Sequence, residues 1–373
     1  MATTEFVVSE SRRLHFSTLI QQVPYVCIAL FVALHAILPT PEGIWLYVPL
    51  LASMLFLGLP HGAVDHMVLL QLQNKVCSPV ALARVIFPYL VLAGCYLVMW
   101  FLTPALAFGL FILITWFHWG QGDVHTLVIF ARAAHLTSVH MRRLALVVRG
   151  GLPMLIPLLA FPEVYQEVFT GITSRFTTAA ATDITWPFAP SFRLGMGLGF
   201  AGLTTFYFLY GFYKLRWGLN RAYLEDLAEV ILLAVLFASV HPLVAIGLYF
   251  CCWHAVRHIA RIVVFSVRDD QPDTGHQVEM KHGAIKLPVI KQGIRRFFIQ
   301  ALPTTLVALL GLGMLHALVP HTPESVAEFT GLYLVLIAVL TVPHVWVVWR
   351  MDTAEGVWST LPQKETVIPV PNS

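Results

Sequence analysis

The sequence predicts an all-α protein, a polytopic integral membrane bundle of about nine or ten spanning helices, and two observations support this fold class. Of the 373 residues, 58% are hydrophobic and only 12% are charged, a balance that soluble domains of this length do not have. The apolar residues form continuous runs instead of alternating with polar ones, which favours helices over the strands of a barrel. We therefore expect the lipid bilayer to surround the chain, and we expect no nucleic-acid partner.

Ten apolar runs are candidate spans. The first run lacks a small-residue cleavage site, so we interpret it as a retained span and not as a signal peptide. Pro157, Pro162 and Glu163 interrupt the fifth run, so a re-entrant or interfacial segment stays open there and would leave nine spans. The ten runs cover residues 23–39, 44–72, 80–102, 105–121, 152–169, 192–213, 227–240, 243–265, 297–319 and 329–349.

Basic residues gather in alternate loops, which the positive-inside rule places in the cytoplasm. With ten spans, both termini lie in the cytoplasm and the chain is a multi-pass protein of the cell membrane. It then divides into a cytoplasmic segment over 1–22, a single transmembrane domain over 23–350 and a cytoplasmic tail over 351–373. Arginine and histidine among the apolar residues of 127–149 predict an amphipathic helix on the inner surface. The basic residues include Lys75, Arg84, Arg132, Arg142, Arg143, Arg149 and Lys214.

The stretch CCWHAVRHIAR, residues 251–261, places two histidines inside an apolar run. His254 and His258 are four residues apart, so both imidazoles lie on one face of a helix and can offer a metal two nitrogen ligands. No glutamate follows the first histidine, so this is not the arrangement of a zinc protease. Ionisable residues within spans are rare and often functional, although a helix end that meets the membrane interface is the alternative.

Other histidines reach the same depth in the predicted membrane. His61 in GLPHGAVDH, His118 in WFHWGQGD and the His254–His258 pair lie about 13 to 17 residues from the outer ends of their spans. That spread is about 6 Å of helix rise, no more than the pair itself requires. Histidines that only pack in a core would have no reason to align, so these four are the predicted metal ligands. His344, in TVPHVWVVW, lies at a similar depth and is either a fifth ligand or a group that supports the ligands.

Carboxylates and aromatic side chains accompany these histidines. Asp65 lies four residues after His61 and Asp123 five residues after His118, so each either orients a ligand imidazole or faces the interface at a helix end. Four neutral imidazoles without thiolates suit iron, copper or zinc. Nearby aromatic residues together suggest an apolar tunnel for a lipid-soluble substrate, although each alone is more typical of a core. The candidate tunnel residues are Trp116, Trp119, Tyr249 and Trp253.

The motifs GLPHGAVDH, FHWGQGD and WHAVRH, in this order, resemble the Brp/Blh family of bacterial and archaeal β-carotene 15,15′-dioxygenases, over roughly residues 45 to 350. The resemblance implies a non-haem iron, Fe(2+), held at the positions of His61, His118, His254 and His258. It implies that O2 cleaves the central double bond of all-trans β-carotene into two molecules of retinal, which supply a microbial rhodopsin. No catalytic residue is expected beyond the metal ligands.

Three other classes of membrane protein share this composition. A di-iron desaturase or hydroxylase needs histidine clusters such as HxxHH at its helix ends, and this sequence has none. A haem-binding electron-transfer subunit places paired histidines at two depths, whereas one depth is filled here. A transporter or carotenoid-binding protein without oxygenase activity stays open. An absorption spectrum separates these classes, because haem gives a Soret band.

Overall fold

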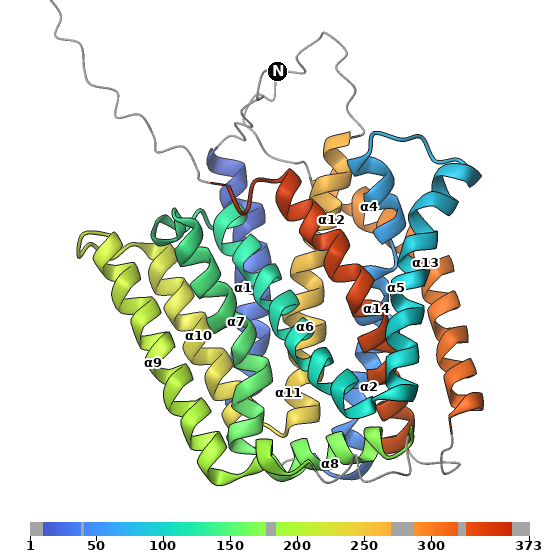
Figure 1. Ribbon diagram of the computed structural model, residues 1–373. Coiled ribbons are helices and arrows are strands. Elements are labelled where there is room, and N and C mark those ends of the chain that lie inside the picture. The colour runs from blue at the N-terminus through green and yellow to red at the C-terminus, as the bar shows by residue number, and fades with distance from the viewer. Residues whose placement is uncertain (1–9, 39–40, 177–183, 270–286, 320–325, 360–373) are drawn as a thin grey trace, which may run out of the picture.

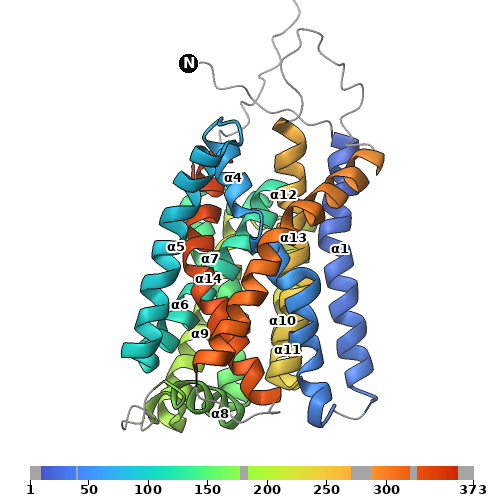
Figure 2. The ribbon, with the colours of Figure 1, turned by 90° about the vertical axis from the view of Figure 1, so that its right-hand side faces the viewer.

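The computed structural model describes residues 10–38, 41–176, 184–269, 287–319 and 326–359. Within these residues the chain forms helices and no strand, so the all-α prediction is confirmed. Seven helices are long and apolar enough to cross a membrane. Figures 1 and 2 show that the long helices run side by side along one direction. The chain is therefore a multi-pass membrane protein.

The helices combine into ten long rods in the described part of the chain, because several successive elements continue one another. The elements are α1 (Glu10–His35), η1 (Gly43–Leu46), α2 (Val48–Ser53), η2 (Met54–Gly58), α3 (Leu59–Gly62), α4 (Asp65–Leu72), α5 (Pro79–Leu102), α6 (Pro104–His125), η3 (Thr126–Phe130), η4 (Ala134–Leu136), α7 (Val139–Ala160), α8 (Pro162–Thr173), η6 (Trp186–Phe188), α9 (Pro190–Lys214), α10 (Arg221–Ser239), α11 (Pro242–Leu248), η7 (Tyr249–Ala255), α12 (Val256–Asp269), α13 (Leu287–Leu318) and α14 (Val326–Ala354).

Local sequence signals set where many helices begin. The side chains of Ser78, Ser138 and Asn220 each accept a hydrogen bond from the backbone N–H three residues later and so cap α5, α7 and α10. Proline occupies the first turn of α5, α6, α8, α9 and α11, where its missing N–H costs no intrahelical bond.

Two predictions for residues 127–169 are wrong. Residues 127–149 do not form a surface helix, because α7 crosses the bundle and Arg142 and Arg149 on it are fully buried. The fifth span is therefore Val139–Ala160 and not 152–169. The chain breaks at Phe161, and α8 lies across one end of the bundle instead of continuing the rod (Figure 1). Hydropathy misplaced this span because two of its arginines are satisfied inside the protein: Arg149 pairs with carboxylates and Arg142 donates to backbone oxygens.

The ends of the chain differ in part from the predicted segments. Helix α1 begins at Glu10, well before the predicted first span at residue 23. Helix α14 ends at Ala354, close to the predicted start of the tail at 351. Residues 1–9 and 360–373 lie outside the described residues, as does the polar segment 270–286 between α12 and α13.

Helices α6 and α7 are in very close contact through glycines. A Cβ atom on Gly120 of α6 would lie 2.2 Å from the backbone oxygen of Leu146, and one on Gly150 of α7 would lie 1.9 Å from that of Trp116. Small residues at such crossings let two backbones approach, which is a common way to join helices in a membrane. This contact fixes α6, the helix that carries His118.

Three rods contain π-helical turns, in which each backbone bond spans one extra residue. These turns are η2, η3 and η7, and they occur in the rods that carry His61, His118 and the His254–His258 pair. Pro60 lies two residues after the end of η2 and lacks an N–H, so the widened turn accommodates the proline ring against the preceding turn. Such turns are frequent at functional sites because they re-aim the side chains that follow.

Candidate metal centre

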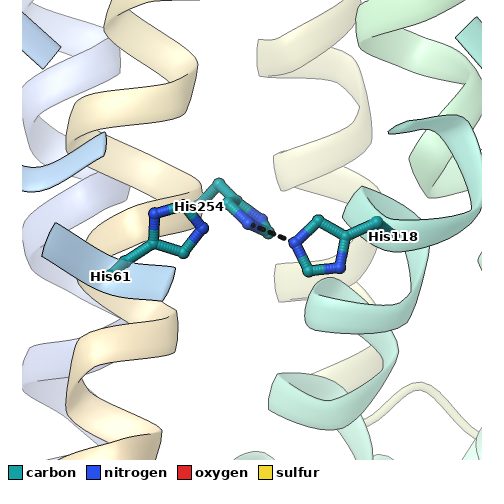
Figure 3. A group of neighbouring side chains, drawn as sticks. All are labelled: His61, His118 and His254. Carbon is teal, nitrogen blue, oxygen red and sulfur yellow. Dashed lines mark hydrogen bonds between the residues drawn. The ribbon is translucent and has the colours of Figure 1, made fainter. Parts of the chain in front are cut away.

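Three histidines from distant parts of the chain meet inside the bundle. His61 on α3, His118 on α6 and His254 on η7 each present a ring nitrogen, and these nitrogens lie within 4.8 Å of one another. Figure 3 shows the three rings turned toward a common point, with Nε2 of His254 3.1 Å from Nε2 of His118. All three side chains are buried.

Two further histidines complete this group. His258 follows His254 by one helical turn, and their rings are almost parallel with centroids 6.3 Å apart, as expected for one helix face. His344 comes from α14 and lies 5.1 Å from the ring of His258. Ring centroids lie 4.7 to 6.5 Å apart in the pairs that include His61 or His118. We call these five residues the histidine cluster.

The ring nitrogens of the histidine cluster fit a metal ion of the kind imidazole binds. Nδ1 of His61 meets the backbone oxygen of Gly58, so that its Nε2 is free to face the cluster. Nε2 of His258 and Nε2 of His344 are buried and have no hydrogen-bond partner among the described residues. Buried nitrogens without partners are costly unless something binds them. A converging set of neutral imidazoles suits iron, copper, nickel or zinc.

The two candidate carboxylates have different surroundings. Asp65 accepts from Nδ1 of His344, with Oδ2 and Oδ1 at 2.8 and 3.0 Å, so it contacts the histidine cluster directly. Asp123 instead accepts from the indole N–H of Trp253 at 3.0 Å and pairs with two arginines. Asp123 is therefore linked to the cluster indirectly, through its own helix α6, which carries His118, and through the helix that carries Trp253 and His254.

A network of buried charges lies on the other side of that helix. Arg257 pairs with Asp123 at 3.1 Å and with Glu229 at 2.6 Å, and its guanidinium stacks on Trp253 with a centroid distance of 3.9 Å. Arg149 on α7 pairs with Asp123, Asp226 and Glu229. The two arginines thus join α6, α7, α10 and α12. We call these five charged residues the arginine network.

A second group of ion pairs joins α12 to the end of α14. Arg261 lies 2.8 Å from Asp352 and 2.6 Å from Glu355, and Gln121 of α6 donates to Asp352 at 2.8 Å. Burial opposes the charge on Glu355, but Arg261 outweighs it and holds the pKa of that carboxyl well below its ordinary value. Helix α12 is therefore anchored by two groups of ion pairs, one at Arg257 and one at Arg261, about one helical turn apart.

An apolar cavity of about 480 Å³ opens beside the histidine cluster. Its walls come mainly from the rod that runs from α2 to α4 and from α5, α6, α8, α11, α13 and α14. Its polar lining includes His61, His118 and His344. Leu90 and Val307 also line it while being 60% and 66% exposed on the outside of the bundle, so the cavity reaches the apolar outer surface. Its size and lining are typical of a site for a small apolar ligand.

One of the four predicted tunnel residues lines this cavity. Trp119 lines the cavity, together with Phe250, whose ring lies 5.4 Å from that of His61. Trp116, Tyr249 and Trp253 are not among its described lining residues. Trp116 donates to the backbone oxygen of Val147 and faces α7, and Trp253 faces the arginine network. These three side chains therefore do not line this cavity, because they point away from it on their helices.

Sequence reasoning missed several residues of the site. The sequence pattern places Arg149 in a surface helix and does not single out Arg257 or Arg261, although charge inside an apolar run is itself a signal of function. Asp226 and Glu229 stand at the start of a short apolar run, which gave the same signal. Their pairing could not be inferred, because partners about 80 residues apart in sequence meet only in the folded bundle.

These features define a class of protein, a multi-pass membrane protein with a buried histidine centre beside an apolar cavity. A family model described as Beta-carotene 15,15'-dioxygenase matches residues 52–352. The chain therefore belongs to the β-carotene 15,15′-dioxygenase family, as its motifs suggested.

Relatives support this assignment over most of the chain. The chain is 39% identical over 327 residues to a protein of Halobacterium salinarum named Probable beta-carotene 15,15'-dioxygenase Blh, covering 86% of this chain and 90% of that protein. It is 28% identical to the Brp protein of the same organism, over 83% of this chain and 84% of that one. A Beta-carotene 15,15'-dioxygenase of an uncultured marine bacterium is 28% identical over 56% of this chain and 67% of its own length. No solved structure matches significantly.

Replacing Arg149 by Met should strongly destabilise the protein. The change leaves the three carboxylates Asp123, Asp226 and Glu229 with Arg257 as the one remaining arginine of the network, and removing one partner of a buried ion pair costs about 3–5 kcal/mol. We expect a clear fall in the thermal unfolding midpoint in detergent. Arg143→Met is the matched control, since Arg143 is exposed on the same helix and should leave the midpoint unchanged. Equal midpoints for both variants would contradict a supporting role for the arginine network.

Proposed function

We propose that this protein cleaves the central double bond of β-carotene with O2 to give two molecules of all-trans-retinal. Its cofactor is Fe(II), and the ligands are His61, His118, His254 and His258. Membership of the family supports the substrate, because the curated relatives are named for this reaction. The retinal formed would supply a microbial rhodopsin in the same membrane.

The observation that carries the proposal is the position of the histidine cluster at the wall of an apolar cavity. His61 and His118 line the cavity directly, while His254 and His258 lie behind them in the cluster. A metal held between these rings would face a space suited to an apolar ligand. A carotenoid has no polar group at its centre, so such a ligand fits this lining better than a polar one.

The protein's own residues would contribute position and exclusion of water. Bound Fe(II) would supply the activation of O2. Trp119 and Phe250 form the wall next to the rings and would hold the central bond of the polyene close to them, which favours reaction there. The cavity wall is mostly hydrocarbon, so reactive species would be shielded from water. No charged residue is needed to bind the substrate.

Regioselectivity should depend on the wall and not on a polar contact. Trp119→Ala removes a large apolar surface beside the cluster, so the carotenoid should shift and give off-centre apocarotenals alongside retinal. Trp116→Ala is the matched control, because it removes the same side chain three residues earlier on α6 but outside the cavity lining. Products are separated by chromatography and expressed per folded, iron-loaded protein. If Trp119→Ala yields retinal alone, the cavity wall at Trp119 does not determine which double bond is cleaved.

The activity itself is tested by producing the chain in cells that make β-carotene. We expect the pigment to bleach and retinal to accumulate, whereas His254→Ala should do neither. Metal analysis of the purified protein should find iron. Retained activity in His254→Ala, or stoichiometric zinc without iron after chelator-free purification, would count against the proposal. A Soret band or a bound, uncleaved carotenoid would favour the alternative of a haem-binding, carotenoid-binding or transport protein.

The orientation in the cell membrane is part of the proposal. The start of α1 and the end of α14 lie at the same end of the bundle, together with the α4–α5, α6–α7 and α9–α10 connections (Figure 1). The basic residues Lys75 and Arg132 stand in the first two connections, and Lys214 ends α9 just before the third. The positive-inside rule assigns that end to the cytoplasm. A reporter enzyme fused after Ser373 should therefore be active in the cytoplasm. Activity only on the opposite side of the membrane would reverse the orientation.

A further inference from the structure

The sequence leaves open whether His344 is a ligand or a supporting group, and the structure places its ring inside the histidine cluster. Its ring centroid lies 5.0 Å from that of His61, 4.8 Å from that of His118 and 5.1 Å from that of His258. The ring also packs beside the backbone of Gly62, where a Cβ atom would lie 3.4 Å from Nδ1 of His344. The ring of His344 is therefore as close to the other rings as they are to one another.

The contact with Asp65 determines which nitrogen of His344 faces the cluster. Both carboxylate oxygens lie within 3.0 Å of Nδ1, so Nδ1 carries the proton and donates it to Asp65. In the neutral ring, Nε2 then holds a lone pair. That Nε2 is buried and has no hydrogen-bond partner among the described residues. A carboxylate on one ring nitrogen with the other left free is the usual arrangement of a metal-bound histidine.

The charge around Asp65 points the same way. Asp123 pairs with Arg149 and Arg257, and Asp352 pairs with Arg261. Asp65 is equally buried, yet its ion-pair partner among the described residues is His344 alone. A buried carboxylate beside a neutral imidazole is poorly compensated, and a divalent cation on the far side of that imidazole would offset its charge.

We propose that His344 is a fifth imidazole ligand of the metal and that Asp65 positions it. The inference rests on the proposed function in so far as the histidine cluster binds Fe(II). The proposal adds one donor, from α14, to the four histidine ligands that the motifs imply. The cavity that His344 lines is apolar, and its proposed substrate cannot donate a hydrogen bond to the lone pair of Nε2. A metal ion is therefore the partner that this lone pair suits.

The test measures metal binding by purified full-length protein and does not depend on turnover. Fe(II) affinity is determined by competition with a chelator, and the coordination is followed through the visible spectrum of Co(II)-loaded protein. His344→Ala should weaken Fe(II) binding by about 100-fold or more, and Asp65→Asn by about 10- to 100-fold. The Co(II) absorption of His344→Ala should intensify as one donor is lost, and added imidazole should restore the original spectrum.

Thr341→Val is the matched control, because Thr341 lines the same cavity one turn before His344 and bonds only to the backbone oxygen of Ile337. It should leave Fe(II) affinity and the Co(II) spectrum unchanged. If His344→Ala fails to fold, His344→Gln keeps the volume and is measured in its place. Wild-type Fe(II) affinity and an unchanged Co(II) spectrum in the His344 variant would overturn the inference and leave an Asp65–His344 pair that supports the fold.

The two proposals fail in different ways. If the wild-type protein binds Co(II) but makes no retinal, the proposed function fails while the Co(II) spectra of the variants still count ligands. If it makes retinal and His344→Ala holds iron as tightly as the wild type, only the fifth ligand is refuted.

Discussion

Charge pairing inside an apolar bundle is the interaction on which the rest of this structure depends. In a medium of low dielectric, an unpaired arginine or carboxylate is far more costly than in water, so each must find a partner before the helices can close. Arg149 and Arg257 share three carboxylates from two other helices. This sharing fixes the relative rotation of four helices, and that rotation places three of the five rings of the histidine cluster, those of His118, His254 and His258.

The helix formed by η7 and α12 shows how the two tasks are divided. His254 and His258 point to the cluster, while Arg257 and Arg261 point to acids on α6, α10 and the end of α14. One face of this helix places two imidazole rings in the histidine cluster, and the other face anchors the helix through ion pairs. The WHAVRH motif therefore encodes a support as well as a set of ligands, and neither half can be changed without affecting the other.

The sequence predicted the helical class, most of the rods and the depth of the histidines, because hydropathy and the helical period are local properties. The meeting of His61, His118 and the His254–His258 pair follows from that depth. Arg149 was misplaced because a hydropathy pattern records a charge but not the partner that neutralises it. Tyr249 and Trp253 lie outside the cavity lining for a related reason, since the widened turn η7 shifts the helix face on which they stand.

The same widened turns affect how relatives of this chain should be aligned. A π-helical turn behaves as a single inserted residue, and removing one residue from a helix rotates everything beyond it by about 100°. A gap of one position within Met54–Gly58 or Tyr249–Ala255 is therefore not a neutral difference in loop length. It separates relatives whose histidines point into the cluster from those whose histidines point elsewhere, even where every motif letter is retained.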